Sequence, residues 1–258
     1  MATAGARRLA ILELLKDSKV VHVSELSRRF DVSEVSIRRD LARLAEYGLL
    51  RRVHGGAISS EPAVVDHPYE DKLELRFEEK KRIGRAAAAL IQPGDRVILD
   101  SGTTVLQVAQ EIAASPKGGE QITAITASLP AFRALAPARH VHLIVLGGIY
   151  LPDHQALVGP QTLANLRELH ADRLFLGADG LSFASGVTTS AVLEAEVSRA
   201  MVRAAAEVIV VADSSKIGQV GLSTIVPLSE IHKLITDEQA PQDFIARLRE
   251  QGVEVILV

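Results

Sequence analysis

The sequence contains no cysteine and no tryptophan, and aromatic residues make up only 3% of its 258 residues. Without cysteine there are no disulfides, no thiolate metal sites and no cysteine nucleophile. So few aromatic rings argue against a base-stacking platform for single-stranded nucleic acid. The chain has no apolar run of membrane-spanning length and no signal-peptide pattern at its N-terminus, so we expect a cytoplasmic protein.

Motifs for nucleotides and metals are absent as well. No G-x-x-x-x-G-K run occurs, which argues against a P-loop nucleotide site. The eight histidines are scattered, and His140 with His142 lack a third ligand nearby, so we expect neither a metal nor another cofactor. The remaining composition, 47% hydrophobic and 24% charged, is ordinary for a globular protein long enough to form more than one domain.

The charges are unevenly distributed along the chain. Residues 1–60 carry eleven Lys or Arg and seven Asp or Glu, a balance of +4, whereas the other residues carry eighteen and twenty-five, a balance of −7. A basic N-terminal block on an acidic body is typical of a protein that binds a polyanion. The bias is modest, so it supports an interpretation that other features must carry.

One segment, 33–48, is expected to form a helix with two distinct faces. Ser33 suits the N-cap and Gly48 the C-terminus. An apolar stripe recurs at helical spacing, formed by Ile37, Leu41 and Leu44. The opposite face carries small hydroxyls and arginines, which fit a DNA major groove because arginine reaches guanine edges and phosphates. For this helix alone, a solvated amphipathic helix is an equal alternative.

The neighbouring segments favour DNA. Helices are expected at 7–16 and at 25–30, the latter capped by Ser24, and residues 31–33 form a tight turn, which together predict a helix-turn-helix. Residues 50–53 and 57–58 flank a Gly-rich loop and predict a hairpin, a basic wing beside the DNA backbone or minor groove. The predicted DNA-binding residues are Ser33, Val35, Ser36, Arg38, Arg39, Arg43, Arg51, Arg52 and His54.

The rest of the chain alternates between strand and helix. We expect a DNA-binding domain at 1–58, a linker at 59–77 that contains Pro62 and Pro68, with a charged, helix-prone end at 70–79, and an α/β domain at 78–258. Strands are expected at 96–100, 122–126, 141–146, 173–177, 208–212, 233–235 and 253–257. Helices are expected at 104–114, 128–135, 161–168, 193–206 and 241–251. This pattern predicts a mostly parallel sheet covered on both faces.

Small polar residues follow several of these strands, where open α/β sheets bind ligands. Asp100-Ser101-Gly102-Thr103-Thr104 opens a helix, and its amides and hydroxyls favour an anion such as phosphate, although a plain capped turn is the alternative. Asp179 could accept sugar hydroxyls and Lys216 could pair with an anion. Each residue alone also suits a loop cap or a surface charge, but their convergence at one edge favours a pocket.

The residues 33–41 and 48–57 resemble the DeoR family of bacterial transcription regulators, whose signature is a helix S-x-x-T/S-I-R-R-D-L followed by R-x-H-G-G. The C-terminal motifs of that family, among them D-x-G-T-T, G-A-D-G and A-D-S-S-K, have counterparts here, so the resemblance covers almost the whole chain. The matching segments are 100–104, 157–160, 177–180, 186–189, 194–197 and 212–216.

This resemblance implies a winged helix-turn-helix and an α/β domain similar in fold to ribose-5-phosphate isomerase. It also implies a homo-oligomeric regulator, most often a repressor of carbohydrate-metabolism genes, which binds double-stranded operator DNA and is released by a phosphorylated sugar or related metabolite. The predicted effector-binding residues are Asp100, Ser101, Gly102, Thr103, Thr104, Thr126, Ser128, Gly147, Gly148, Asp179, Thr188, Glu194 and Lys216.

Two departures from the family pattern bear on the effector. Many members have Asn where this chain has Ala127, and Pro-Asn where it has Ser190-Ala191, so two amide side chains that could hold sugar hydroxyls are missing. The rival interpretation is a sugar-phosphate isomerase with a DNA-binding appendage, in which Glu194 or Glu196 would act as the base. Residues 185–189 replace the Gly-rich, Lys-containing loop of such isomerases. This replacement favours the interpretation as a regulator, and we expect no catalytic residue.

Overall fold

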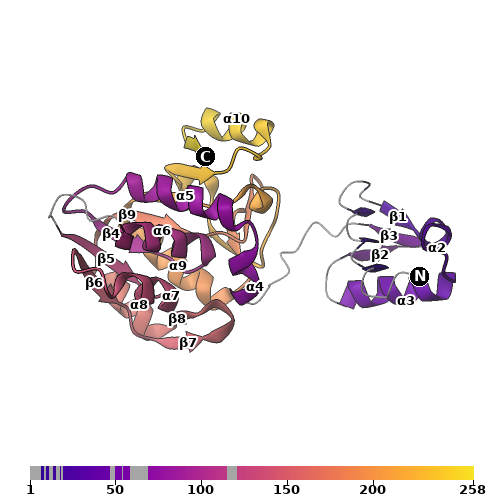
Figure 1. Ribbon diagram of the computed structural model, residues 1–258, viewed down its shortest axis with the longest axis horizontal. Coiled ribbons are helices and arrows are strands. Elements are labelled where there is room, and N and C mark those ends of the chain that lie inside the picture. The colour runs from indigo at the N-terminus through magenta and orange to yellow at the C-terminus, as the bar shows by residue number, and fades with distance from the viewer. Residues whose placement is uncertain are drawn as a thin grey trace. The chain divides into compact units, whose positions relative to one another are not determined.

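The computed structural model describes residues 7–8, 10–11, 14–15, 18, 20–46, 50–53, 55–58, 69–114 and 121–258 (Figure 1). The chain divides into two compact units, Met1–Val65 and Asp66–Val258. Each unit has its own hydrophobic core. The domain boundaries expected at residues 58 and 78 stay predictions.

The first unit, called the head below, contains the expected helix-turn-helix. Its elements are β1 (Val20–His22), α2 (Val23–Phe30), α3 (Glu34–Glu46), β2 (Arg51–Val53) and β3 (Gly56–Ile58). The described residues between 7 and 18 that precede β1 are helical. The apolar stripe of α3, from Ile37 to Leu44, packs with Ile11, Leu15 and Leu26 in one core. The N-cap of α2 is His22, so the expectation that Ser24 caps this helix was wrong, and Ser24 lies inside the first turn.

The expected wing is present and has a third strand. β2 and β3 pair antiparallel, with Arg52 opposite Ala57. β1 pairs with the other edge of β3, which the sequence analysis did not predict. Gly56 is required at this junction because a Cβ there would lie 2.1 Å from the carbonyl oxygen of Val21.

The second unit, called the body below, is built on a seven-stranded sheet in which every neighbouring pair is parallel. Its order is β15-β14-β12-β9-β4-β5-β6. The strands are β4 (Arg96–Leu99), β5 (Ile122–Thr126), β6 (Val141–Val145), β9 (Ala171–Leu176), β12 (Ala205–Val211), β14 (Lys233–Thr236) and β15 (Glu254–Leu257). The expected α/β class with a parallel sheet is confirmed.

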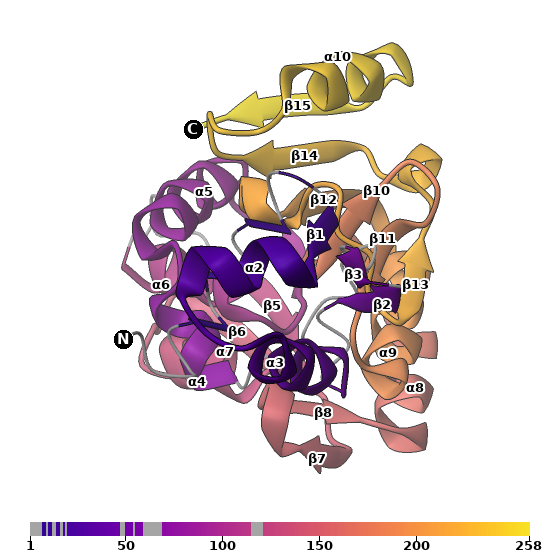
Figure 2. The ribbon, with the colours of Figure 1, turned by 90° about the vertical axis from the view of Figure 1, so that its right-hand side faces the viewer.

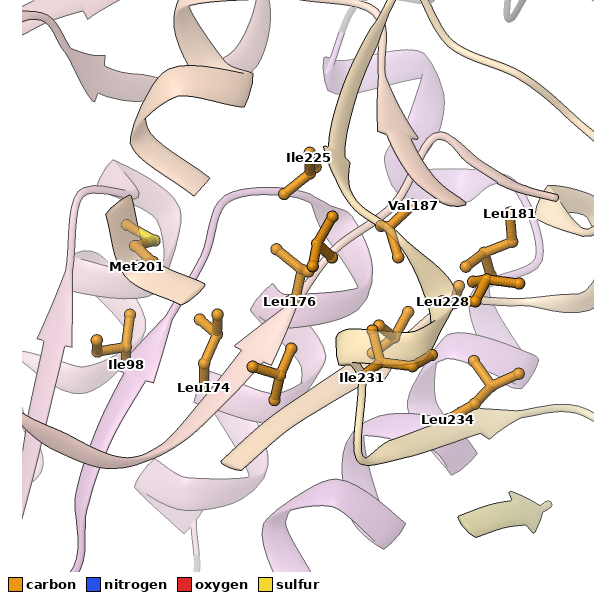
Figure 3. Close-up of a cluster of buried hydrophobic side chains, with 14 of the residues drawn as sticks. Ile98, Leu174, Leu176, Leu181, Val187, Met201, Ile225, Leu228, Ile231 and Leu234 are labelled. Carbon is orange, nitrogen blue, oxygen red and sulfur yellow. The ribbon is translucent and has the colours of Figure 1, made fainter. Parts of the chain in front are cut away.

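Helices cover both faces of this sheet (Figure 2). They are α5 (Phe77–Ala89), α6 (Thr103–Ala114), α7 (Leu129–Leu135), α8 (Pro160–Arg167), α9 (Val192–Ala204) and α10 (Gln242–Glu250). Val97 and Leu99 pack with α5, α6 and α7 on one face, whereas Ile98 joins the cluster of α8, α9 and α10 on the other. Figure 3 shows part of the second cluster around Leu174, Leu176 and Met201. This two-residue alternation explains why the strands read as continuous apolar runs.

Several short elements at the carboxyl edge of the sheet were not expected. They are the hairpin β7 (Ile149–Leu151) and β8 (Ala156–Val158), and the sheet of β10 (Gly180–Ser182), β11 (Gly186–Thr189) and β13 (Ser223–Val226). Three short 3-10 helices, η1 (Pro152–His154), η2 (Ser214–Lys216) and η3 (Leu228–Glu230), lie in the loops.

The segment expected to be a linker, 59–77, contains a helix of the body. Residues 59–68 lie outside the described residues, but α4 (Tyr69–Glu74) follows and has Tyr69 buried. The helix-prone end predicted at 70–79 is therefore confirmed in part, and it belongs to the body rather than to a free connection.

Candidate functional sites

The outer face of α3 forms the first candidate site. The Ser33 hydroxyl accepts a hydrogen bond from the Ser36 amide at 3.3 Å and caps the helix as predicted. Arg38, Arg39 and Arg43 are exposed, and Val35 keeps 61% of its surface exposed. Exposed arginines beside an exposed valine suit base edges, because arginine pairs with guanine and an apolar group contacts the thymine methyl.

The arginines of the head differ in what holds them. Arg38 pairs with Glu34 at 2.5 Å, but both side chains are about half exposed, so the pair is weak in water and open to exchange for a phosphate. Arg52 on β2 is exposed. The side chain of Arg51 and all of His54 lie outside the described residues, so their predicted roles stay predictions.

Asp40, within the same motif, faces inward. Its carboxylate accepts a hydrogen bond from Arg7 Nε at 2.6 Å, and the two side chains are only 8% and 11% exposed. This ion pair ties the N-terminal helical segment to α3. The sequence analysis did not predict it, because the helical spacing of Asp40 alone does not identify a partner 33 residues away.

The carboxyl edge of the body sheet forms the second candidate site. Asp100 directly follows β4 and is buried, where it accepts hydrogen bonds from the Gly177 amide at 3.3 Å and the Ser198 hydroxyl at 3.2 Å. Burial, and next the nearby negative charge of Glu194, raise the pKa of Asp100 to about 7.

Glu194 on α9 gathers donors from three separate segments. Ser101 donates to Oε1 at 2.5 Å, Thr189 donates to Oε2 at 2.6 Å, and His154 Nδ1 lies 3.3 Å from Oε2. The structure thus brings together the predicted residues Asp100, Ser101 and Glu194. Thr189 and His154 join them without having been predicted; the G-x-T-T motif was the available signal for Thr189.

Asp179, after β9, continues this network. Its Oδ2 accepts hydrogen bonds from the Ser190 amide at 3.0 Å and from the Ser190 hydroxyl at 2.9 Å, and it lies 3.1 Å from Thr189 Oγ1, whose one proton goes to the nearer Glu194. Its Oδ1 lies 3.2 Å from Lys72 Nζ. Burial raises the pKa of Asp179, but Lys72, the Ser190 amide and Lys216 outweigh it and lower the pKa to about 2, so the carboxylate is ionised.

Lysines from three elements meet beside Asp179. Lys80 of α5 is buried and donates to the backbone carbonyl of Lys72 in α4. Burial, which Asp213 opposes, and the positive charges of Lys216 and Lys72 lower the pKa of Lys80 to about 8. The ammonium of Lys216 in η2 makes no hydrogen bond or ion pair in the described part of the chain. We call Lys72, Lys80 and Lys216 the lysine cluster.

The sequence analysis found Lys216 and missed the other two lysines. Lys72 lies in the segment expected to be a linker. Lys80 lies on the buried stripe of α5 with Ile83, Gly84 and Ala87. A lysine on an apolar stripe was the signal that could have identified it, because a buried charge requires a partner or a ligand.

The start of α6 has free space at Gly102. Gly102 has a φ of +104°, and a Cβ at this position would meet no atom within 4 Å. The hydroxyls of Thr103 and Thr104 have no partner among the residues that the structure describes. The first-turn amides of a helix favour an anion, and Thr103 and Thr104, which supply them here, are buried.

Other predicted effector residues are used within the protein. Thr126 donates to the Leu99 carbonyl at 2.8 Å, Ser128 caps α7, and Thr188 donates to the Gly180 carbonyl at 3.2 Å. The Gly147 carbonyl accepts from Thr162 at 2.8 Å, and a Cβ at Gly148 would lie 2.2 Å from the Thr162 hydroxyl. Their contacts with an effector stay predictions, and the geometry assigns them to shaping the loops.

The polar network is nearly closed over. The side chains of Lys72, Asp179 and Glu194 are between 12% and 16% exposed. A hollow of about 200 Å³ lies at the opposite edge of the sheet, near Ile122 and His140, where β5 and β6 begin. Another, of about 310 Å³, lies between α8 and α9.

The described residues contain no group of three His, Asp or Glu placed to hold a metal ion. None of their helices is both long and apolar enough to cross a membrane.

Comparison with known proteins identifies the chain. Residues 7–63 match the DeoR-like helix-turn-helix domain, and residues 76–238 match the DeoR C terminal sensor domain. A proposed aga operon transcriptional repressor from Escherichia coli O157:H7 is 39% identical over 98% of this chain and 93% of its own length. The transcriptional repressor GlcR from Bacillus subtilis is 34% identical over 97% of this chain and 95% of its own.

The chain belongs to the DeoR family. This DeoR-family protein is a DNA-binding transcriptional regulator, and the resemblance drawn from the motifs is confirmed. Its relatives are named as regulators, which favours that function over the isomerase alternative. A ribose-5-phosphate isomerase from Methanocaldococcus jannaschii aligns over 54% of this chain and 53% of its own, with 18% identity and a TM-score of 0.41. A likeness at that level bears on neither the site nor the chemistry.

Proposed function

We propose that this DeoR-family regulator represses genes of carbohydrate metabolism by binding operator DNA through α3 and the wing, and that a phosphorylated sugar or related metabolite releases it. The observation that carries the effector half is the lysine cluster. Three lysines at the carboxyl edge of a parallel sheet offer a phosphate several charge-assisted hydrogen bonds.

The neighbouring network supplies the contacts that a sugar needs. Ser101, Thr189 and His154 surround Glu194, so hydroxyl donors and acceptors alternate over a short distance. Carboxylates and hydroxyls of this kind hold sugar hydroxyls, while the lysines hold the phosphate. Because Ala127 and Ser190-Ala191 replace the amides common in the family, we infer an effector that differs from the most frequent ones.

Regulation requires more than binding. We propose that two or more subunits associate through their bodies in the cytoplasm, so that paired heads meet half-sites about 34 Å apart or a multiple of that distance. The effector must bind one arrangement of the heads more tightly than another, since equal affinity would shift nothing.

Substitutions in the head and in the body test the two halves separately. Duplexes selected from random DNA by the wild-type protein serve as operators in gel shifts. Arg38→Ala and Arg39→Ala should each weaken binding by about 1 to 3 kcal/mol if the lost contact is to a base. Arg82→Ala, an exposed arginine of α5, is the matched control. If both head variants bind like wild type, α3 does not read the operator.

The effector half is tested on Lys216, whose ammonium makes no hydrogen bond or ion pair with the described residues. Phosphorylated sugars are screened by thermal shift, since a ligand that binds only the folded state raises the melting temperature. Lys216→Met should bind operator normally yet lose both the thermal shift and the release from DNA. An unchanged response in Lys216→Met would place the effector elsewhere on the body.

A further inference from the structure

Helix α4 lies across the candidate effector site and is attached to it by polar contacts. Lys72 Nζ lies 3.2 Å from Asp179, and the Lys72 carbonyl accepts from Lys80. Glu70 accepts from Gln155, next to η1, at 2.7 Å. These partners belong to the turn after β9, to α5 and to the β7–β8 hairpin, so a six-residue helix spans separate segments of the carboxyl edge.

Two features of the structure raise the free energy of α4 in its present position. Arg76, between α4 and α5, adopts a left-handed conformation with φ 51° and ψ 42°, which a non-glycine residue adopts only when its surroundings enforce it. Its guanidinium reaches the Ser214 hydroxyl at 3.2 Å and Gln239 Oε1 at 3.1 Å, and these contacts hold the turn. The Tyr69 hydroxyl is buried without a hydrogen-bond partner, a second unfavourable term.

Apolar packing does little to secure the junction. Leu75 and Phe77, which flank Arg76, are 54% and 45% exposed. The buried ring of Tyr69 anchors the start of α4, whereas Lys72 in its centre is held by the carboxylate that faces the lysine cluster. Glu194 and Asp179 beneath it are at most 13% exposed, so a sugar-sized ligand reaches them only if part of this edge moves.

We propose that α4 is a strap that an anionic ligand opens, because the anion takes Lys72 away from Asp179 and holds it together with Lys80 and Lys216. A phosphomonoester carries nearly two negative charges, so it competes well with a single carboxylate for Lys72. Asp179 keeps its hydrogen bonds from the Ser190 amide and hydroxyl after the exchange. The inference rests on the proposed function only in treating this anion as the effector.

The strap also stands next to the head in the chain. α4 begins at Tyr69 and the head ends at Val65, so the lysine that would bind the ligand lies only a few residues along the chain from the end of the head.

The absence of cysteine permits a direct test on the full-length protein. Glu74→Cys places one thiol on the exposed side of α4 for a nitroxide label, and Arg82→Cys places one on α5 as the reference. In electron paramagnetic resonance, adding Lys72→Met should shorten the rotational correlation time of the label at 74 by about twofold, because α4 loses its ion pair. The label at 82 should not change. Lys81→Met, a lysine of α5 with no partner among the described residues, is the matched control.

Inorganic phosphate, compared with chloride at equal ionic strength, is the ligand probe. Phosphate should change the spectrum of the label at 74 in the wild-type background, because Lys72 exchanges Asp179 for the anion, and should change nothing in Lys72→Met. If Lys72→Met unfolds the body, as melting would reveal, Asp179→Asn replaces it with the same expected result.

The outcomes separate the strap from the site. A label at 74 that stays equally immobile in Lys72→Met and in Asp179→Asn would overturn the strap. A melting temperature raised by phosphate with no change at residue 74 would also overturn it, yet leave the effector site standing. Phosphate that changes neither quantity would overturn the exchange of anions.

Discussion

The head and the body use positive charge in opposite ways. In the head, Arg38 and Arg39 stand on an exposed helix face, and the one pair among them is weak. In the body, Lys80 is only 4% exposed, and Lys72, whose side chain is 16% exposed, contacts the carboxylate of Asp179. A DNA duplex is large and approaches from outside, so the cations that bind it must be exposed. A small metabolite is enclosed by its site, so the cations that bind it are buried.

The comparison also separates charges that bind from charges that support. Asp40 of the head, buried against Arg7, behaves like a residue of the body, although it lies on the same helix as the exposed arginines. Stability measurements can establish this difference, and the expected effects fall from several kcal/mol to a few tenths.

The largest effect is expected from Asp40→Ala. This change leaves the guanidinium of Arg7 buried without its partner, and losing one member of a buried pair costs about 3 kcal/mol or more. Calorimetry should show the transition of the head at lower temperature while that of the body stays in place. If the head melts as in wild type, Asp40 does not anchor α3.

A smaller effect, of opposite pH dependence to most carboxylates, is expected in the body. Because the folded pKa of Asp100 is raised to about 7, the protonated form is favoured in the fold, and stability falls as pH rises from the unfolded value toward 7. Wild type should therefore lose about 2 kcal/mol of body stability between about pH 5 and about pH 7 that Asp100→Asn retains.

Melting of the body transition against pH measures this difference. Asp243→Asn, an exposed aspartate of α10, is the control and should follow wild type throughout. Parallel curves for wild type and Asp100→Asn would mean that Asp100 is ionised in the folded protein.

The smallest effect is expected from Glu34→Ala. It removes the exposed partner of Arg38, and pairs of this kind contribute about 0.5 kcal/mol or less. Chemical denaturation of the head should hardly change, while gel shifts should show operator binding at least as tight, since Arg38 is freed and a negative charge is removed. A loss comparable to that of Asp40→Ala would mean that exposure does not distinguish the two pairs.

What the sequence could predict follows the same division. The cap at Ser33, the apolar stripe of α3 and the exposed arginines arise from local spacing, and the structure reproduces them. The parallel sheet was predictable for the same reason, since apolar runs between helices indicate strands buried on both faces.

The parts that escaped prediction depend on distant contacts. The pairing of β1 with β3 joins residues as distant as Val20 and Ile58. The network around Glu194 joins residues up to 93 positions apart, so His154 could not be assigned from its neighbours in the sequence. Lys72 was missed because two prolines upstream and a run of charges are typical of a linker, whereas its role arises from Asp179, 107 residues later.

The place of α4 has a practical consequence for anyone who builds hybrid regulators from this family. A graft joined at residue 78 would carry the sheet without Lys72 and Arg76, and so would lose two cations that contact the carboxyl edge of the body. A graft joined before Tyr69 keeps α4 together with the sheet that it contacts. Such hybrids should inherit the metabolite response of the parent that supplied α4.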